Sequence, residues 1–387
     1  MLRKIYMKEM KDAFRDRRTL LLTVLVPILM MTAMTFFYES MISGDEGETY
    51  NLAVASSIGT EEESILSMNE NIEIIKSEEP EQAVLEGEAH AALLLEDDFQ
   101  SEIISGSQVE ATIVGDSFSQ NSATLMSIVT SHLQLYERNI VAENLQSQGI
   151  DPSVVEPINL VEREISAENP NINLLAMLIP LMLALAIGIG AGPAAADLFA
   201  GEKERKTMEA LLMTPVNRST MLLAKWLTIV SIGSIIGIVT LLVVALEIQF
   251  FTVHLQEAVS DSLEGQTYVI IGGGVVISIV YAMFTASLLM LTSIIGKTVK
   301  EAQSYSTPVM MLVIFPIMVI TGVGVNELSF IHFAIPFLNL FSLIKELLFG
   351  IVNYEHILIT VVSNLIVVVV VLIISRILFM KDRWVMD

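Results

Sequence analysis

No cysteine occurs among the 387 residues of this chain. Disulfide frameworks and thiolate metal sites are therefore excluded. The five histidines are scattered and none lies in an H-E-x-x-H pair, so the zinc-protease site that this motif forms is not expected. The fragment Gly296-Lys297-Thr298 does not complete the phosphate-binding motif G-x-x-x-x-G-K-[ST], because Leu291 stands where the first glycine is required. We expect no cofactor to be bound by this chain.

Charged residues are missing from the centres of six long apolar segments. The mean hydropathy is +0.64, and about 20 apolar residues are enough for a helix to cross a bilayer. An ionised side chain at the centre of such a span costs about 2.5–3.5 kcal/mol. Asp197, Glu247 and Arg376 lie near segment ends, where we expect them to reach water. We predict a polytopic α-helical membrane protein with six transmembrane helices, at 19–38, 172–196, 221–246, 268–295, 304–325 and 356–379.

Basic residues are few, and their placement predicts the orientation. Seventeen of the 21 Lys and Arg lie in the segments 1–18, 198–225, 296–301 and 376–387. Cytoplasmic loops of membrane proteins carry an excess of Lys and Arg. We therefore expect both termini in the cytoplasm, and we expect the basic helix in segment 1–18 to lie against the anionic inner leaflet of the bilayer.

The negative charge is confined to residues 39–171. This segment holds 27 Asp and Glu against three Lys and Arg, a net charge of −24, which argues against nucleic acid as a partner. We predict an acidic extracellular α/β domain between spans one and two, because strand and helix patterns alternate along it. The expected strands are 50–56, 72–75, 91–95 and 111–114, and the expected helices are 79–87, 98–106 and 120–148.

Local signals mark the ends of the last of these helices. Asp116, Ser117 and Ser119 offer N-cap oxygens, and Gly149 suits the position after the C-cap. The acidic clusters 61–63 and 96–98 do not match the calcium loop D-x-[DN]-x-[DN]-G. We interpret both clusters as a solvated face rather than a cation site.

Residues 1–18 separate into three stripes at helical spacing, which predicts an amphipathic elbow helix on the cytoplasmic membrane surface. The functional interpretation is that this helix contacts a cytoplasmic partner, and the alternative is an orientation signal with no further role. The stripes are basic (Lys4, Lys8, Lys11, Arg15 and Arg18), apolar (Leu2, Tyr6, Met10, Ala13 and Phe14) and acidic (Glu9, Asp12 and Asp16).

Segment 326–350 is apolar but is interrupted by Pro336 and carries Glu327, Lys345 and Glu346. We predict two short helices that dip back into the membrane from its outer face, since such a break is tolerated where protein covers it. The alternative is an interfacial loop.

The segment 197–225 lies between spans two and three. Residues Glu202–Lys206 form a charged turn, and Met208, Leu211 and Leu212 follow at helical spacing. Thr214 and Pro215 then suit the N-cap and first position of the next helix. We predict a short amphipathic cytoplasmic helix over 198–213 that docks in a groove of a soluble subunit. The alternative is a basic patch with internal ion pairs, each worth less than about 1 kcal/mol.

The run E-K-E-R-K-T-M-E-x-L-L-x-T-P, at 202–215, resembles the signature of type-2 ABC exporter permeases. That family has six spans, an elbow helix, a coupling helix between spans two and three, and short outer helices between spans five and six. The large first outer loop is similar to that of the bacterial sodium-extruding members. The resemblance implies a bacterial cytoplasmic-membrane permease that pairs with itself and is driven by a separate homodimeric ATPase, which binds ATP and Mg²⁺. It also implies ATPase contacts through Glu202, Arg205, Thr207, Glu209, Leu211 and Leu212.

The resemblance implies Na⁺ as the exported substrate, but no span carries a central carboxylate of the kind that marks ion paths. Neutral oxygens in the spans are the candidate ligands: Asn173, Thr228, Ser231, Thr285, Ser287, Ser304, Thr307, Ser363 and Asn364. Lipids, drugs or peptides are alternative substrates for this family. A transmembrane signalling or mechanical relay with an extracellular sensor domain, or a passive receptor or scaffold, is the alternative outside transport.

Overall fold

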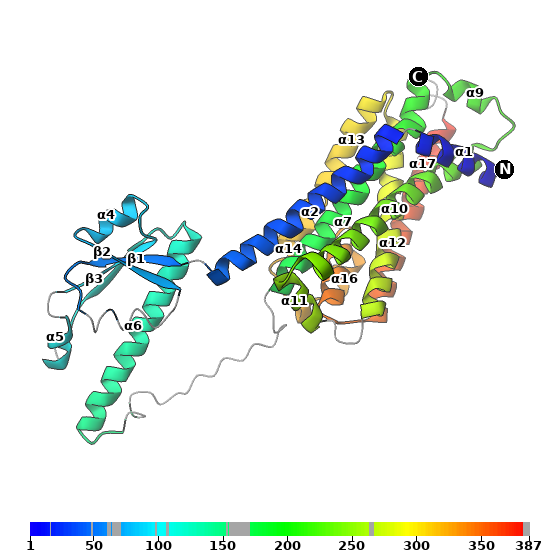
Figure 1. The fold of residues 1–387 in the computed structure, drawn as a ribbon. Coiled ribbons are helices and arrows are strands. Elements are labelled where there is room, and N and C mark those ends of the chain that lie inside the picture. The colour runs from blue at the N-terminus through cyan, green and yellow to red at the C-terminus, as the bar shows by residue number, and fades with distance from the viewer. Residues whose placement is uncertain are drawn as a thin grey trace. The chain divides into compact units, whose positions relative to one another are not determined.

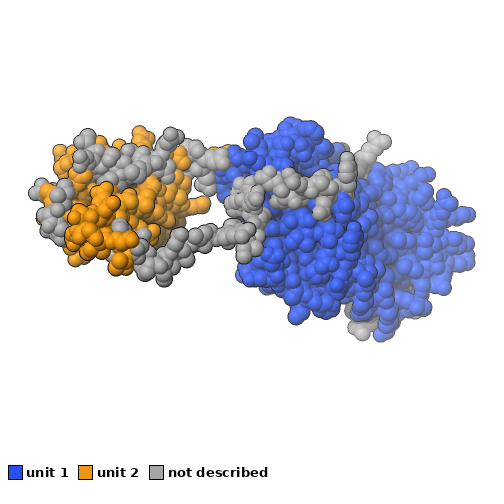
Figure 2. Space-filling view, turned by 90° about the horizontal axis from the view of Figure 1, so that it is seen from below, with its two compact units in different colours: residues 1–42, 164–387 blue, residues 43–163 orange. Residues whose placement is uncertain are grey.

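The computed structural model describes residues 1–15, 17–47, 49–59, 63, 71–96, 99–105, 108–151, 154, 171–262 and 267–381. The chain divides into two compact units, which Figure 2 shows in different colours. The first unit comprises residues 1–42 and 164–387, and the second comprises residues 43–163. Each unit has its own core and is described by itself.

The first unit is a helical bundle. Within the described residues, six helical segments are long and apolar enough to cross a membrane, so the predicted number of spans is confirmed. These segments are Leu21–Ser43, Ile172–Glu204, Arg218–Phe251, Val269–Ile295, Val299–Ile320 and Tyr354–Met380. The helices that form them are α2 (Arg17–Gly47), α7 (Asn171–Ala196) with the two short helical turns that follow it as far as Glu204, α10 (Arg218–Phe251), α12 (Thr267–Ile295), α13 (Val299–Met311) with α14 (Ile314–Ile320), and α17 (Tyr354–Met380) (Figure 1).

Helices α7, α10 and α12 form the centre of the bundle. Ile187 of α7, Ile229 of α10 and Tyr281 of α12 are all buried in one continuous apolar core. A side chain at Gly237 of α10 would collide with Ser278 and Ile187. Glycine therefore permits the close approach of these three helices, as small residues do in membrane bundles.

The fifth span differs from the expected single helix over 304–325. It begins earlier, at Val299, and is interrupted at Leu312 and Val313. Pro316 explains the interruption, because it has no N–H to donate to the carbonyl of Leu312 four residues before it.

Segment 326–350 contains two short helices, as predicted: α15 (Phe330–Ala334) and α16 (Leu338–Leu348). The break lies at Pro336, after which Phe337 adopts a φ of 71°. Every residue of α16 is buried, including Lys345 and Glu346. Lys345 donates hydrogen bonds to the carbonyl of Ile320, the last residue of α14, and to that of Val323 in the turn that follows α14.

The second unit is a four-stranded sheet in the order β2-β1-β3-β4. Its strands are β1 (Tyr50–Ala55), β2 (Ile72–Ser77), β3 (Ala91–Leu95) and β4 (Ala111–Gly115). β1 pairs in parallel with β2 and β3, with Leu52 opposite Ile74 and Ala91, and β4 pairs antiparallel to β3. All four predicted strands are present in this sheet.

Helices cover both faces of this sheet (Figure 1). α6 (Gln120–Ser147) packs Leu125 and Val129 against Leu52 and Leu93, whereas α4 (Pro80–Leu85) packs Ala83 against the other face. The third helix is α5 (Phe99–Ser105).

The predicted ends of α6 are also confirmed. The side chain of Ser119 caps its first turn by accepting from the N–H of Ser122, and Gly149 follows its end with a φ of 74°. Glu61, Glu62, Asp97 and Asp98 of the acidic clusters lie outside the described residues.

Candidate functional site

The charged turn Glu202–Lys206 continues directly from span two. After α7 the chain forms one π-helical turn, η2 (Asp197–Gly201), then α8 (Glu202–Glu204). Lys206 adopts a φ of 56°, which ends this stretch before α9 (Met208–Leu212). The prediction of one helix over 198–213 is therefore wrong, because the left-handed residue divides it.

The next helix also begins later than predicted. Asn217, rather than Thr214, caps α10, and its side chain accepts from the N–H of Ser219 at 3.0 Å. Thr214 instead donates its hydroxyl to the carbonyl of Leu211 at the end of α9. Both residues carry N-cap oxygens, and the prediction chose the wrong one.

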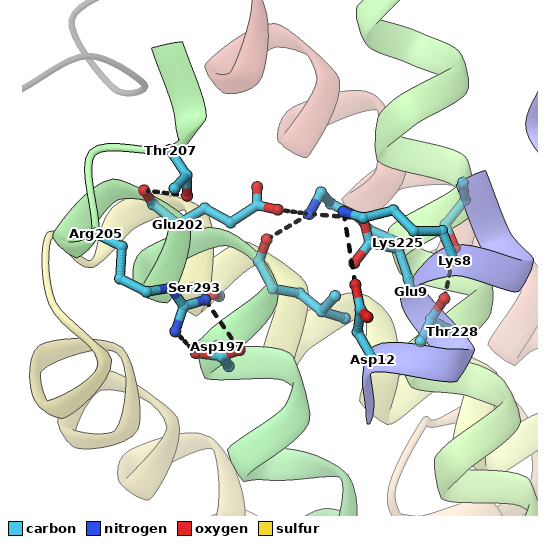
Figure 3. A network of polar contacts seen from close by, with 12 residues as sticks. Lys8, Glu9, Asp12, Asp197, Glu202, Arg205, Thr207, Lys225, Thr228 and Ser293 are labelled. Carbon is cyan, nitrogen blue, oxygen red and sulfur yellow. Dashed lines mark hydrogen bonds and ion pairs between the residues drawn. The ribbon is translucent and has the colours of Figure 1, made fainter. Parts of the chain in front are cut away.

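Lys225 of α10 lies at the centre of a buried ion cluster (Figure 3). Its side chain is 0% exposed, and its Nζ lies 2.8 Å from Glu202 Oε1 and 3.5 Å from Glu9 Oε1. It also donates to the carbonyl of Leu198 at 2.8 Å and lies 5.5 Å from the centre of the Phe199 ring. Removing one member of such a cluster leaves an uncompensated buried charge. Three separate parts of the chain thus depend on one lysine.

The elbow helix α1 (Leu2–Arg15) contributes Glu9 to this cluster. Glu9 is buried, and Lys8 reaches its carboxylate at 3.3 Å and that of Asp12 at 3.8 Å. Partial burial lowers the pKa of Lys8, but the carboxylates of Glu9, Glu202 and Asp12 together outweigh this effect, so the pKa is raised above its ordinary value. The hydroxyl of Tyr6 shares a hydrogen bond of 2.8 Å with Ser231 of α10.

The predicted stripes of α1 face different surroundings. Met10 and Ala13 of the apolar stripe pack against α7 and α10. Four members of the basic stripe are exposed: Lys4, Lys8, Lys11 and Arg15. Arg18 lies in the first turn of α2 rather than in the elbow helix. Its side chain and all of Asp16 lie outside the described residues.

Arg205 and Thr207 hold the charged turn in shape. Arg205 donates two hydrogen bonds to the carboxylate of Asp197, at 2.7 and 3.1 Å. This bidentate contact raises the pKa of Arg205. The backbone N–H and the hydroxyl of Thr207 both donate to the carbonyl of Glu202, at 2.9 and 3.2 Å.

Lys203 and Glu204 join the charged turn to the loop between α12 and α13. Lys203 donates to the carbonyls of Ile294 and Gly296, the latter at 3.0 Å. Glu204 accepts from the N–H of Val299 at 2.9 Å. The ammonium group of Lys203 thus lies at the C-terminal end of α12, and the carboxylate of Glu204 lies at the N-terminal end of α13. The dipoles of both helices favour these positions.

The apolar stripe of α9 faces the bundle. Met208 is 1% exposed in the central core, and Leu211 packs against that core. The exposed side consists of Glu209, Ala210 and Met213, and Met213 is 88% exposed. The side chain of Leu212 lies outside the described residues. Of the predicted ATPase contacts on this helix, Glu209 is therefore exposed to a partner and Leu211 is half-buried against the core.

The candidate pathway oxygens are distributed over α7, α10, α12, α13 and α17. Most of them bond to their own helix, as hydroxyls in spans commonly do. These bonds join Thr228 to Ala224, Ser231 to Leu227, Ser287 to Phe284, Ser304 to Lys300, Thr307 to Gln303, Ser363 to Thr360 and Asn364 to Thr360. Asn173 is exposed and lines a cavity of about 420 Å³, and Thr285 is buried. Within the described contacts, no two of the candidate oxygens are hydrogen-bonded to each other.

Two charged residues in the spans were missed or misjudged from the sequence. Lys225 lies in the apolar start of span three. A single lysine there, with acidic residues in the preceding loop, was the sequence signal that could have indicated a buried ion pair. Glu247 was expected to reach water, but it is only 7% exposed and accepts a hydrogen bond from the hydroxyl of Thr32 in α2.

A cavity of about 390 Å³ lies beside the ion cluster. Its walls come from α1, α2, α7, α10 and α13 and are mainly apolar, including Phe14, Pro193 and Ile236. Glu9, Asp12 and Asp197 supply its charged part.

Comparison with known proteins places these features in a family. Residues 3–384 match the family described as ABC-2 family transporter protein. The chain is 38% identical to the ABC transporter permease protein NatB of Bacillus subtilis (strain 168), over the full length of both chains. No solved structure shows a significant match. With six candidate spans and a family match over almost its whole length, this chain belongs to the ABC-2 transporter family and is a multi-pass membrane permease.

Proposed function

We propose that this chain is the membrane-spanning half of an ATP-driven exporter that extrudes Na⁺. It pairs with a second copy of itself, and a separate ATPase dimer supplies the ATP, the Mg²⁺ and the hydrolysis. Sodium as the cargo rests on the resemblance to sodium-extruding members of the family and on the full-length similarity to the NatB permease. In this proposal both termini are cytoplasmic and residues 39–171 are extracellular, as the Lys and Arg distribution favours.

The buried Glu9–Lys225–Glu202 cluster is the observation that best supports coupling to an ATPase. It joins the elbow helix, the charged turn and span three within 3.5 Å of one ammonium group. Lys203 and Glu204 extend these contacts to the helix ends of spans four and five. A force applied to the charged turn would therefore reach four elements through short polar contacts rather than through a flexible loop.

The ATPase would dock on the exposed side of α9. Glu209 and Met213 present a carboxylate and an apolar side chain side by side, which suits a shallow groove with a basic rim. Arg205 and Thr207 would then act as positioning residues, because their contacts shape the turn that carries α9.

Transport of radiolabelled Na⁺ into inverted membrane vesicles tests the proposed activity. The vesicles would hold this chain with its ATPase, and the control would carry an ATPase inactivated at its catalytic glutamate. We expect uptake that requires ATP and disappears in the control. ATP hydrolysis without Na⁺ movement would reject sodium as the cargo.

Export of an amphiphile is the second candidate, and the cavity beside α1 and α2 favours it. Its apolar walls and acidic part match a cationic amphiphile in size and charge. Stimulation of ATP hydrolysis by such compounds, but not by Na⁺, would select this candidate over the first.

A further inference from the structure

Four glutamates of the first unit are buried among the described residues: Glu9, Glu202, Glu247 and Glu346. Three of them have a basic partner. Glu9 and Glu202 contact Lys225, and Glu346 lies 2.7 Å from Nδ1 of His356. Across the described part of the chain, no Lys, Arg or His lies within ion-pair distance of Glu247. A buried carboxylate without a counter-charge is costly in a membrane span and marks a functional site.

The surroundings of Glu247 supply oxygen but no positive charge. Its Oε1 accepts the hydroxyl hydrogen of Thr32. Its Oε2 is buried and has no hydrogen-bond partner among the described residues. The Thr32 oxygen retains lone pairs, so the two side chains together offer three oxygens to a hard cation.

Glu39 keeps this pair of helices together. Its carboxylate accepts from the N–H groups of Val253, His254 and Leu255, where α10 gives way to α11 (His254–Ser262). Glu39 follows Thr32 by seven residues, or two turns, and so lies on the same side of α2. Glu39 is therefore satisfied by backbone donors, and it holds Thr32 opposite Glu247.

We propose that Glu247, with the hydroxyl of Thr32, binds an alkali-metal cation at the contact between spans one and three. The cation supplies the positive charge that the protein does not provide there. Glu247 lies about one turn before the end of α10, which places the site toward the side to which an exporter releases its cargo. This inference deepens the proposed function and rests on it for the identity of the cation, Na⁺.

Labelling with dicyclohexylcarbodiimide tests the site without ATP. This reagent attacks protonated carboxyl groups in apolar surroundings, so a bound cation protects its ligand. The purified permease with its ATPase would be labelled in NaCl, KCl or choline chloride at equal ionic strength, and the adduct would be mapped by peptide mass spectrometry. We expect an adduct on Glu247 in choline and a saturable decrease as Na⁺ or K⁺ is added.

Three variants sharpen this test. Glu247→Gln should abolish the cation-sensitive labelling, and Thr32→Val should shift half-protection to a higher cation concentration. Glu257→Gln is the matched control, because Glu257 is an exposed acidic residue of the adjacent α11, and it should leave protection unchanged. An adduct on Glu247 that neither cation reduces, or no adduct on Glu247 under any condition, would overturn the proposal.

The outcome is separable from that of the proposed function. If cations protect Glu247 but no ATP-driven Na⁺ uptake occurs, the cation site is supported and the proposal of Na⁺ export is rejected. ATP-driven Na⁺ uptake that persists in Glu247→Gln, with labelling insensitive to cations, would retain the exporter and reject the site.

Discussion

Lys225 and Glu202 form an ion pair in which Nζ lies 2.8 Å from Oε1, and the lysine side chain is fully shielded from solvent. The two residues belong to span three and to the charged turn after span two, and Glu9 of the elbow helix approaches the same ammonium group. Lys8 also reaches the carboxylate of Glu9 at 3.3 Å. Because two ammonium groups thus face two carboxylates, the folded bundle tolerates the burial of these groups. This dependence makes the cluster a sensitive point for both stability and coupling.

Replacing Lys225 by Met should destabilise the bundle by about 3–5 kcal/mol, because two carboxylates lose their shared cation while remaining buried. The measurement is the thermal unfolding of the purified permease in detergent. Lys300→Met is the control, since Lys300 is exposed, and it should change stability little. The second change Glu202→Gln should recover part of the loss. Equal stability of the Lys225 and Lys300 variants would show that water reaches the cluster.

Replacing Met213 by Asp should weaken co-purification of the ATPase while leaving the stability of the permease unchanged. Met213 is 88% exposed on the face of α9 proposed for docking, so the substitution affects only a partner. Leu85→Asp is the matched control, because Leu85 is 81% exposed in the second unit. If the ATPase is retained equally by both variants, the docking face lies elsewhere.

Replacing Lys206 by Gly should stabilise the permease by about 0.5–1 kcal/mol, because a left-handed backbone costs an L-residue energy that glycine avoids. Lys206 has a φ of 56°. Lys297→Gly removes the same charge from an exposed position without a positive φ and should give no gain. Thermal unfolding of the two variants compares them directly, and a loss of stability in Lys206→Gly would indicate that its side chain matters more than its backbone.

Residues 43–163 should fold when expressed alone, because this unit has its own apolar core on both faces of its sheet. Circular dichroism and cooperative thermal unfolding would detect the fold. Leu52→Ala should cost about 2–5 kcal/mol, since Leu52 is fully buried. Leu85→Ala, at an exposed position, should cost much less. A fragment without cooperative unfolding would mean that the unit needs the bundle for its stability.

Local patterns predicted much of the fold. Long apolar runs located the six spans, and alternating segments located the strands of the second unit. The ends of α6 followed from Ser119 and Gly149, whose effects act within one helical turn. Signals failed where two neighbouring residues offered the same chemistry, as Thr214 and Asn217 did for the start of α10.

The candidate site was predicted only in part. The charged turn was located from its residue order. The exposed face of α9 was not, because helical spacing identifies an apolar stripe but does not say whether this stripe packs against the bundle or faces a partner. Met208 is buried in the core to which spans two and three contribute. The interruption near Pro316 was likewise overlooked, because the residues around this proline, Ile314–Ile320, are all apolar.

The sequence by itself determined the membrane spans, the α/β class of the inserted unit and the position of the charged turn, because hydropathy, alternation and caps act over short distances along the chain. Only the tertiary structure decided which charged groups share a buried environment. Glu9, Glu202 and Lys225 come from three separate segments, and Glu247 meets Thr32 across two helices. Burial and pairing depend on how helices pack around each side chain, and no local pattern encodes that packing.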